Sequence, residues 1–281
     1  MLKSRKLWNI ICIIALITAI VAGAVVKVNL DRIKEATQLP ILAESMMHGT
    51  SYEVTMRENK SDKKVIEKSD IDFSDITIAC IGDSITEGKN GSVPYPTYLK
   101  EILGAKEVYN YGVGGVPLAR RRTGVSFFDT LDDIDDGIDV IVVLGGGNDM
   151  FYNEMSGFGD IKAEERVEYT FCSELEVFME TIKKDFPEAL TIYLAPSDNV
   201  LYDLVREDTE LLVDKELYAE AFQVISVEQD VILYDMYNSY FLSAQDDDIK
   251  EEFMQDNIHF NSKGHEIIAT KVAALIIKNM E

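Results

Sequence analysis

Polar residues with complementary chemistry follow successive apolar runs in the C-terminal three quarters of this sequence. Ser84 comes shortly after the first of these runs, and Gly115 and Asn148 follow the next two. Asp256 and His259 lie just before the last helical pattern. A hydroxyl, flexible backbone N–H donors, an amide, an acid and an imidazole are the groups that acyl transfer through a serine nucleophile requires.

The spacing and residue types fit this chemistry. Asp256 and His259 lie three residues apart, so a single loop can direct both side chains toward Ser84. A glycine at position 115 lets a backbone N–H approach a substrate without an intervening Cβ. The Asn148 side chain does not ionise, so it can donate a hydrogen bond at any pH.

The neighbours of Ser84 leave two interpretations open. A serine after a strand is commonly a helix N-cap, and Ser84 could have that structural role alone. Its surroundings, GDSITEG, differ from the G-x-S-x-G elbow of α/β-hydrolases. We expect Asp83 to tie down the loop and not to be the acid partner of the histidine.

The other candidates also have structural alternatives. Asn148 and Asp149 could form a simple turn, and Asp256 could cap a turn before the final helix. His265 competes with His259 for the role of base. It follows a glycine at the helix start and has no acid three residues before it. The pattern therefore favours His259.

The elements that must position these residues alternate between strand and helix patterns from residue 76 onward. Such alternation predicts a parallel sheet covered by helices on both faces. In such sheets, active sites gather beyond the carboxyl ends of the strands, where the polar clusters occur, including Pro196–Asn199. The expected strands are Ile76–Ile81, Glu107–Tyr111, Asp139–Leu144, Leu190–Leu194 and Val231–Tyr234, and the expected helices are Tyr95–Leu103, Ala163–Asp185, Thr209–Glu228 and Ser262–Met280.

Four short segments resemble the signature blocks of the SGNH, or GDSL-type, hydrolase superfamily. GDSITEG resembles the first block, NYGVGG the second, GGGND the third and DNIH the last. Their order and their positions after the expected strands match as well. The resemblance covers Ile76 to Glu281 and implies an SGNH hydrolase domain at residues 76–281. The implied fold is a three-layer α/β/α sandwich with a five-stranded parallel, flavodoxin-like sheet.

The resemblance also implies a role for each matched residue. Ser84 would be the nucleophile, and His259 would take its proton and later protonate the leaving alcohol. Asp256 would orient the imidazole and stabilise its charged form. The oxyanion hole would consist of the Ser84 backbone N–H, the Gly115 backbone N–H and the Asn148 side chain. Neither a metal nor an organic cofactor is implied.

The N-terminal part of the sequence predicts membrane targeting. The uncharged run Trp8–Val26 follows the basic stretch Lys3–Lys6. As a helix, it is long enough for a hydrocarbon core of roughly 30 Å, and the basic residues predict an extracytoplasmic domain after it. The alternative is a signal peptide cleaved near residues 22–24, which would give a secreted protein, but the length of the run favours an uncleaved anchor. We expect an anchor or signal segment at residues 1–27 and a polar juxtamembrane stalk at 28–75.

Composition limits the classes of partner. Hydrophobic residues make up 47% of the 281 residues, enough for a sizeable core. The chain has 50 acidic and 27 basic residues, for a formal net charge of -23. Such a surface repels phosphate backbones, so nucleic acid is excluded as an expected partner.

The expected activity is that of a serine esterase acting through an acyl-enzyme. The compact loops and the absence of a long apolar lid segment from the sequence favour short acyl groups, such as acetyl esters of extracellular or cell-wall carbohydrate. A lysophospholipase or lipase-like esterase is the alternative, and an acyltransferase would use the same residues with a sugar hydroxyl in place of water. A non-catalytic cell-surface binding module would instead make the Ser84 hydroxyl dispensable.

Overall fold

The computed structural model of the chain describes residues 49–121, 124–151, 157–198 and 215–281. The expected anchor at residues 1–27 and the first part of the expected stalk lie outside these ranges. Within the ranges, no helix is both long enough and apolar enough to cross a bilayer.

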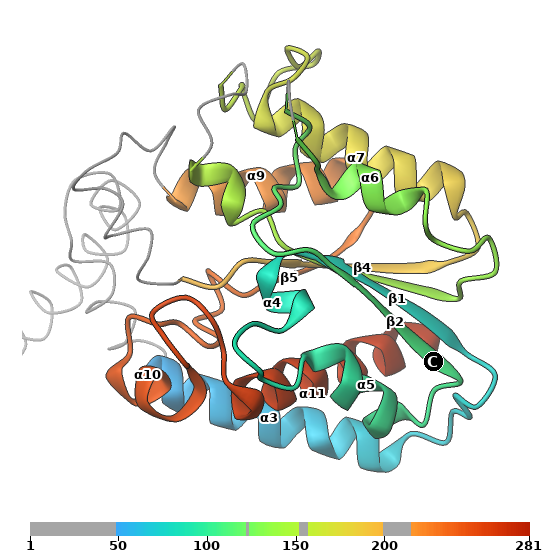
Figure 1. The fold of residues 1–281 in the computed structure, drawn as a ribbon, viewed down its shortest axis with the longest axis vertical. Helices are drawn as coiled ribbons and strands as arrows, with labels where there is room; N and C mark the ends of the chain where they lie inside the picture. Colours follow the sequence, from blue (N-terminus) through green and yellow to red (C-terminus); the bar gives the residue numbers. More distant parts are fainter. Residues whose placement is uncertain (1–48, 122–123, 152–156, 199–214) are drawn as a thin grey trace, which may run out of the picture. The chain divides into compact units, whose positions relative to one another are not determined.

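A five-stranded parallel sheet forms the centre of the domain, as predicted (Figure 1). Its strand order is β2-β1-β3-β4-β5, so the chain reverses its winding direction between β1 and β3. In open parallel sheets, ligands bind beyond the carboxyl ends of the strands at such a switch point. The strands are β1 (Thr77–Gly82), β2 (Glu107–Gly112), β3 (Val140–Leu144), β4 (Leu190–Ala195) and β5 (Ile232–Asp235).

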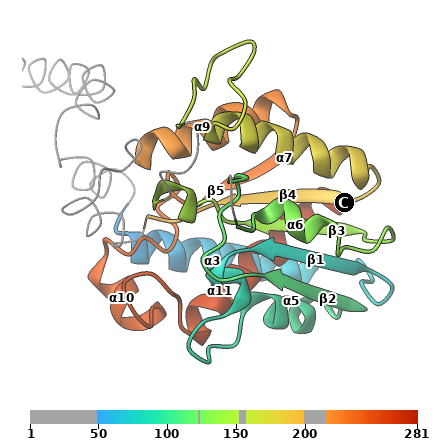
Figure 2. The same cartoon turned by 45° about the horizontal axis from the view of Figure 1, so that its top comes forward.

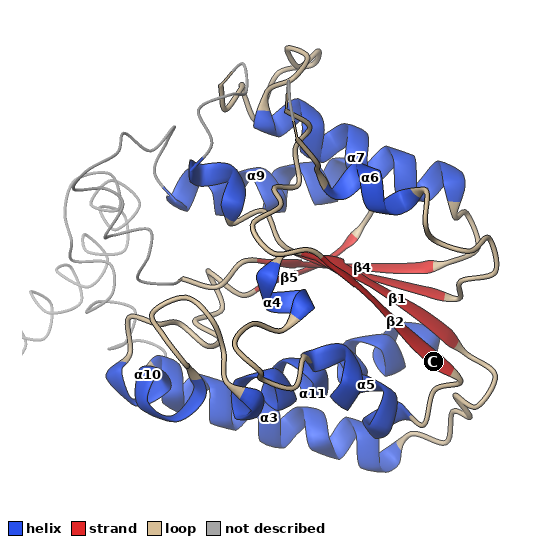
Figure 3. Cartoon of the chain, viewed as in Figure 1, coloured by secondary structure: helices blue, strands red, loops and turns tan. Residues whose placement is uncertain are grey.

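Helices cover both faces of the sheet, which gives the predicted three layers (Figures 1 and 3). One face carries α6 (Phe127–Leu131), α7 (Phe171–Asp185) and α9 (Lys215–Glu228). The opposite face carries α3 (Ser51–Lys68), α5 (Tyr95–Leu103), α10 (Asp247–Phe253) and α11 (Ser262–Met280). The turned view shows β2, β1, β3 and β4 side by side in that order (Figure 2).

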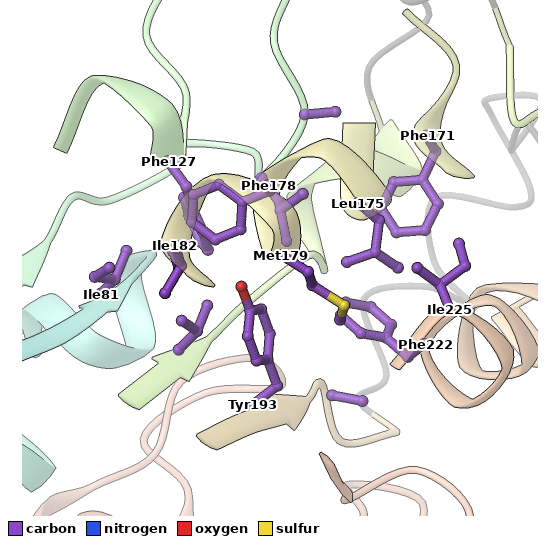
Figure 4. Close-up of a cluster of buried hydrophobic side chains, with 14 of the residues drawn as sticks. Ile81, Phe127, Phe171, Leu175, Phe178, Met179, Ile182, Tyr193, Phe222 and Ile225 are labelled. Atoms are coloured by element: carbon purple, nitrogen blue, oxygen red, sulfur yellow. The ribbon is translucent and has the colours of Figure 1, made fainter. Parts of the chain in front are cut away.

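Each face of the sheet has its own apolar core. Alternate residues of β1 divide between them: Ile81 contributes to the core under α6, α7 and α9, and Cys80 to the core on the other side. The first core is rich in aromatic rings, and Phe178 packs edge-on against both Phe127 and Tyr193 (Figure 4). Burial on both faces explains why β1 and β3 read as continuous apolar runs.

Helix α3 corrects the second part of the predicted stalk. The compact unit starts at Thr50, so residues 50–75 belong to the folded domain and not to a linker. Thr50 caps the helix with a capping box that includes Glu53. The helix escaped prediction because several of its buried positions are polar, Thr55 and Asn59 among them, and hydrophobic periodicity does not detect such a face.

A buried ionic cluster joins α3 to α11 and β5. The ammonium of Lys271 lies 2.7 Å from Glu58 and 2.5 Å from Asp62. The hydroxyl of Tyr234 donates to the same Glu58 carboxylate, and Lys278 lies 3.4 Å from Asp62. Because Lys271 and Asp62 are almost fully buried, each compensates the desolvation of the other.

Helix α7 begins later than predicted, at Phe171 in place of Ala163. Tyr169 adopts a left-handed φ of 64°, which an α-helix cannot continue through. Thr170 then caps the helix by accepting from the Ser173 N–H. The preceding segment is held by Arg166, whose side chain is only 3% exposed and pairs with carboxylates of α7 and α9. The predicted helix start at Thr209 lies outside the described residues, which show α9 from Lys215.

We predict that Lys271→Met lowers the free energy of unfolding by about 3–5 kcal/mol, because Asp62 loses its closest cation while remaining buried. Equilibrium urea unfolding followed by circular dichroism measures the change. The matched control is Lys263→Met, since the Lys263 side chain is 69% exposed and lies 3.5 Å from Glu252. That change should cost about 1 kcal/mol or less. Equal losses in the two variants would contradict the role given to the buried cluster.

Candidate active site

Three polar loops leave the sheet at the same level. The register pairs Gly82, the last residue of β1, with Gly112 of β2 and with Leu144 of β3. The chain beyond these three positions carries Ser84, Gly115 and Asn148. Parallel pairing therefore brings three predicted site residues to one edge of the sheet, although they are far apart in the sequence.

Ser84 is the first residue of the short helix α4 (Ser84–Glu87), directly after β1. The N-cap is Asp83, whose Oδ1 accepts the Ile85 N–H at 2.9 Å. The alternative in which Ser84 itself caps the helix is therefore excluded, and its hydroxyl is available for another contact. Close packing holds α4 in place: a Cβ on Gly112 would lie 2.1 Å from the Glu87 nitrogen, so only glycine fits there.

His259 makes the contact to Ser84. Its Nε2 lies 3.0 Å from the Ser84 Oγ, and its Nδ1 lies 2.9 Å from Oδ2 of Asp256. Because a carboxylate can only accept, Nδ1 carries the proton and Nε2 presents its lone pair to the serine hydroxyl. The three residues that the sequence nominated as nucleophile, base and acid are thus joined in that order.

The loop between α10 and α11 holds the imidazole of His259 in place. Oδ1 of Asp256 accepts the backbone N–H groups of Ile258 at 2.8 Å and His259 at 2.7 Å. Partial burial raises the pKa of Asp256, but the backbone N–H of His259, its ring and the Ile258 N–H together outweigh burial and hold the pKa below its usual value. Asp256 therefore stays ionised and stabilises a positive charge on His259. The turn that it caps is the one that carries the histidine.

His265, the competing histidine, lies in a different environment. It is in the first turn of α11, 1% exposed, and its ring packs edge-on against Phe260. Burial, with a smaller contribution from the nearby charge of His259, lowers the pKa of His265 to about 4. A buried histidine of this kind is a poor proton acceptor, so the structure favours His259 over His265, as the sequence did.

The two further oxyanion candidates lie in neighbouring turns. Gly115 has a φ of 77°, and the Val116 N–H bonds back to Val113 O at 3.3 Å, the pattern of a type II turn that requires glycine at this position. Asn148 begins the 3₁₀ helix η1 (Asn148–Phe151). Its Nδ2 donates to Val116 O at 3.1 Å, which ties the amide to the Gly115 turn.

Asp149 supports this arrangement, and sequence reasoning missed its part. Its carboxylate is fully buried and accepts the backbone N–H groups of Leu118 at 2.9 Å and Ala119 at 2.8 Å. Burial, helped by the charge of Asp83, raises its pKa to about 7 although the two donors oppose the shift. Asn148 and Asp149 therefore do not form the simple turn considered from the sequence. The only feature of the sequence that pointed to this role of Asp149 was the position of an acid shortly after a glycine run.

The fourth polar cluster lies at the end of β4. Asp198 forms an ion pair with Lys215 at 2.7 Å, and its backbone oxygen accepts the Ala244 N–H. These contacts connect β4 to the start of α9 and to the segment before α10. Asn199 of the same cluster lies outside the described residues. Among the described residues, no group of three or more His, Cys, Asp or Glu side chains could hold a metal ion.

Comparison with known proteins identifies the class of this arrangement. The sequence profile of the GDSL-like lipase/acylhydrolase family matches residues 80–267. One solved structure is 27% identical, with a TM-score of 0.63 over 73% of this chain and 97% of that chain. A Lactobacillus plantarum protein is 19% identical, with a TM-score of 0.63 over 74% and 98%. The acetyl xylan esterase AlAXEase is 18% identical, with a TM-score of 0.50 over 72% and 100%. No curated protein sequence matches the chain.

We predict that Ser84→Ala and His259→Ala each lower kcat for p-nitrophenyl acetate by about 10⁴-fold or more, and that the double variant is no worse than either single variant. We expect the two side chains to act as one proton-transfer unit, so that loss of either removes it. Steady-state kinetics on folded variants measures this, with the exposed Ser74→Ala as control. A natively folded Ser84→Ala variant with parental activity would refute the assignment.

Proposed function

The chain belongs to the GDSL-like lipase/acylhydrolase family, a family of ester hydrolases, and we propose that it cleaves carboxylic esters through an acyl-enzyme on Ser84. The observation that carries this proposal is the contact of 3.0 Å between Ser84 Oγ and His259 Nε2, with Asp256 bound to the other ring nitrogen. A hydroxyl, a base and an orienting acid in this order activate a serine nucleophile.

In the acylation step, Ser84 Oγ attacks the ester carbonyl carbon while His259 Nε2 takes the hydroxyl proton. The resulting imidazolium is stabilised by the Asp256 carboxylate. Collapse of the tetrahedral intermediate breaks the bond to the leaving alcohol, which receives the proton from Nε2. Water then gives a proton to His259, attacks the acyl-serine and releases the acid, and the proton returns to Ser84.

The oxyanion of each tetrahedral intermediate needs fixed hydrogen-bond donors. We assign this role to the backbone N–H groups of Ser84 and Gly115 and to the amide of Asn148. The Val116 contact that joins Asn148 to the Gly115 turn supports the assignment, since it couples two of the three donors. One donor of this kind is worth about 3–4 kcal/mol of the barrier.

The natural substrate that we propose is a short acyl ester, such as an acetyl group on an extracellular or cell-wall carbohydrate. Two observations support this choice. The net charge of -23 disfavours anionic lipid surfaces and leaves neutral sugars as suitable carriers of the ester. AlAXEase, a solved acetyl xylan esterase, has the same fold, which makes acetylated xylan a reasonable first glycan to test.

We predict that kcat/KM for p-nitrophenyl acetate exceeds that for p-nitrophenyl octanoate by about tenfold or more, because a site for short acyl groups excludes the longer chain. Acetate release from acetylated xylo-oligosaccharides, measured by chromatography and absent in Ser84→Ala, would extend the result to glycans. Preference for octanoate or for lysophosphatidylcholine would replace this substrate with a lipid. Formation of a new ester with an added alcohol acceptor would identify acyl transfer.

We also propose that the domain acts outside the cytoplasm on an N-terminal anchor, on the basis of the uncharged run Trp8–Val26 and the basic residues before it. The full chain produced in bacterial cells should stay in the membrane fraction after alkaline carbonate extraction. The double change Ile14→Arg with Leu16→Arg places two charges in the middle of the run and should release the chain from that fraction. Recovery of a shortened product in the medium, from the chain without these two changes, would indicate a cleaved signal peptide.

A further inference from the structure

The Asn148 amide lies between two acceptors. Its nitrogen donates to Val116 O at 3.1 Å and faces Oδ2 of Asp83 at 3.4 Å. A side-chain amide can rotate by 180° into an orientation of nearly the same shape, which exchanges its nitrogen and its oxygen. Acceptors on both contacts favour the nitrogen at this position, because the amide oxygen would meet two other oxygens there.

Asp83 divides its two oxygens between two tasks. Oδ1 accepts the Ile85 N–H and so caps α4, the helix that starts with Ser84. Oδ2 points to Asn148 under the glycine run after β3, where a Cβ on Gly145 would lie 3.6 Å from it. One buried carboxyl therefore connects the element that carries the nucleophile with the amide after β3.

We infer that Asp83 is a positioning residue for the oxyanion hole: it holds the Asn148 amide with one N–H toward the Gly115 turn and the other toward the start of α4. This inference rests on the proposed function. At 3.4 Å the contact is at the long end of the hydrogen-bond range. The N–H that faces Asp83 can therefore be shared with the developing oxyanion, while the Val116 oxygen keeps the other N–H of the same planar amide. An interaction that improves only as charge develops lowers the barrier and leaves substrate binding unchanged.

Asp83→Asn separates this role from helix capping. Asparagine caps helices as well as aspartate does, so the contact to Ile85 can persist. The asparagine has a single side-chain oxygen, which cannot accept from both Ile85 and Asn148. If that oxygen caps Ile85, the NH₂ group of the new asparagine faces the NH₂ group of Asn148, and two donors meet. We expect kcat for p-nitrophenyl acetate to fall by about tenfold or more with KM changed less than about twofold. Asp83→Ser also keeps a residue that can cap the helix, but its side chain is shorter. It should show the same loss of kcat and replaces Asp83→Asn in the test if that variant folds poorly.

Asp246→Asn is the matched control. Asp246 is the N-cap of α10, and its two oxygens also serve two partners, the N–H groups of Asp248 and Tyr52. The same isosteric change there should leave kcat at the parental value, because neither partner contacts Asn148 or Ser84. A similar loss of kcat in both variants would show a general effect of weakening a cap and would overturn the inference.

A double-variant cycle gives the decisive result. Asn148→Ala removes the amide, so Asp83→Asn should have no further effect on kcat in that background. An unchanged kcat in Asp83→Asn, or the same fold loss with and without Asn148, would overturn the inference. Ser84→Ala is assayed beside these variants. If Ser84→Ala retains parental activity, the proposed function itself fails. If Ser84→Ala loses activity while Asp83→Asn keeps the parental kcat, only the positioning role of Asp83 is overturned.

Discussion

The hydrogen-bonded register of β1 with its two neighbours sets the geometry of the whole site. Pairing of Gly82 with Gly112 on one side and with Leu144 on the other fixes the level at which three loops leave the sheet. A slip of one residue in either pair would move a loop and turn its side chains to the opposite face of the sheet. Continuous burial of β1 and β3 makes such a slip costly, so the core specifies the site.

Buried carboxyls then convert this approximate placement into fixed contacts. Asp83 caps α4, the helix that begins with Ser84, and Asp149 holds two backbone N–H groups of the segment after the Gly115 turn. Burial raises the pKa of both, to about 6 for Asp83 and about 7 for Asp149. The shift reflects a cost, because a low-polarity environment disfavours the charged form. In the proposed oxyanion hole, this cost is offset by donors that need not reorganise as charge develops on the substrate.

His259, the proposed base, comes from the C-terminal part of the chain and has separate support. The loop with Asp256 and His259 lies between α10 and α11, and Asn261 holds its end by capping α11 and donating to Glu252 O. Helix α11 is in turn fixed to α3 through Lys271. Helix α3 thus belongs to the framework that supports the histidine, although it precedes the segment that matches the family.

Local patterns were enough to predict the alternation of strands and helices and the parallel sheet. The resemblance of four short segments to the SGNH blocks, with the chemistry of the matched residues, nominated Ser84, Asp256 and His259. Three-dimensional packing was needed to show that α3 joins the domain, that Asp83 also contacts Asn148, and that Asp149 holds the segment after the Gly115 turn. The partners of these carboxyls lie far away in the sequence or are backbone groups that carry no sequence signal. A buried polar contact is defined by both of its members, and folding alone brings them together.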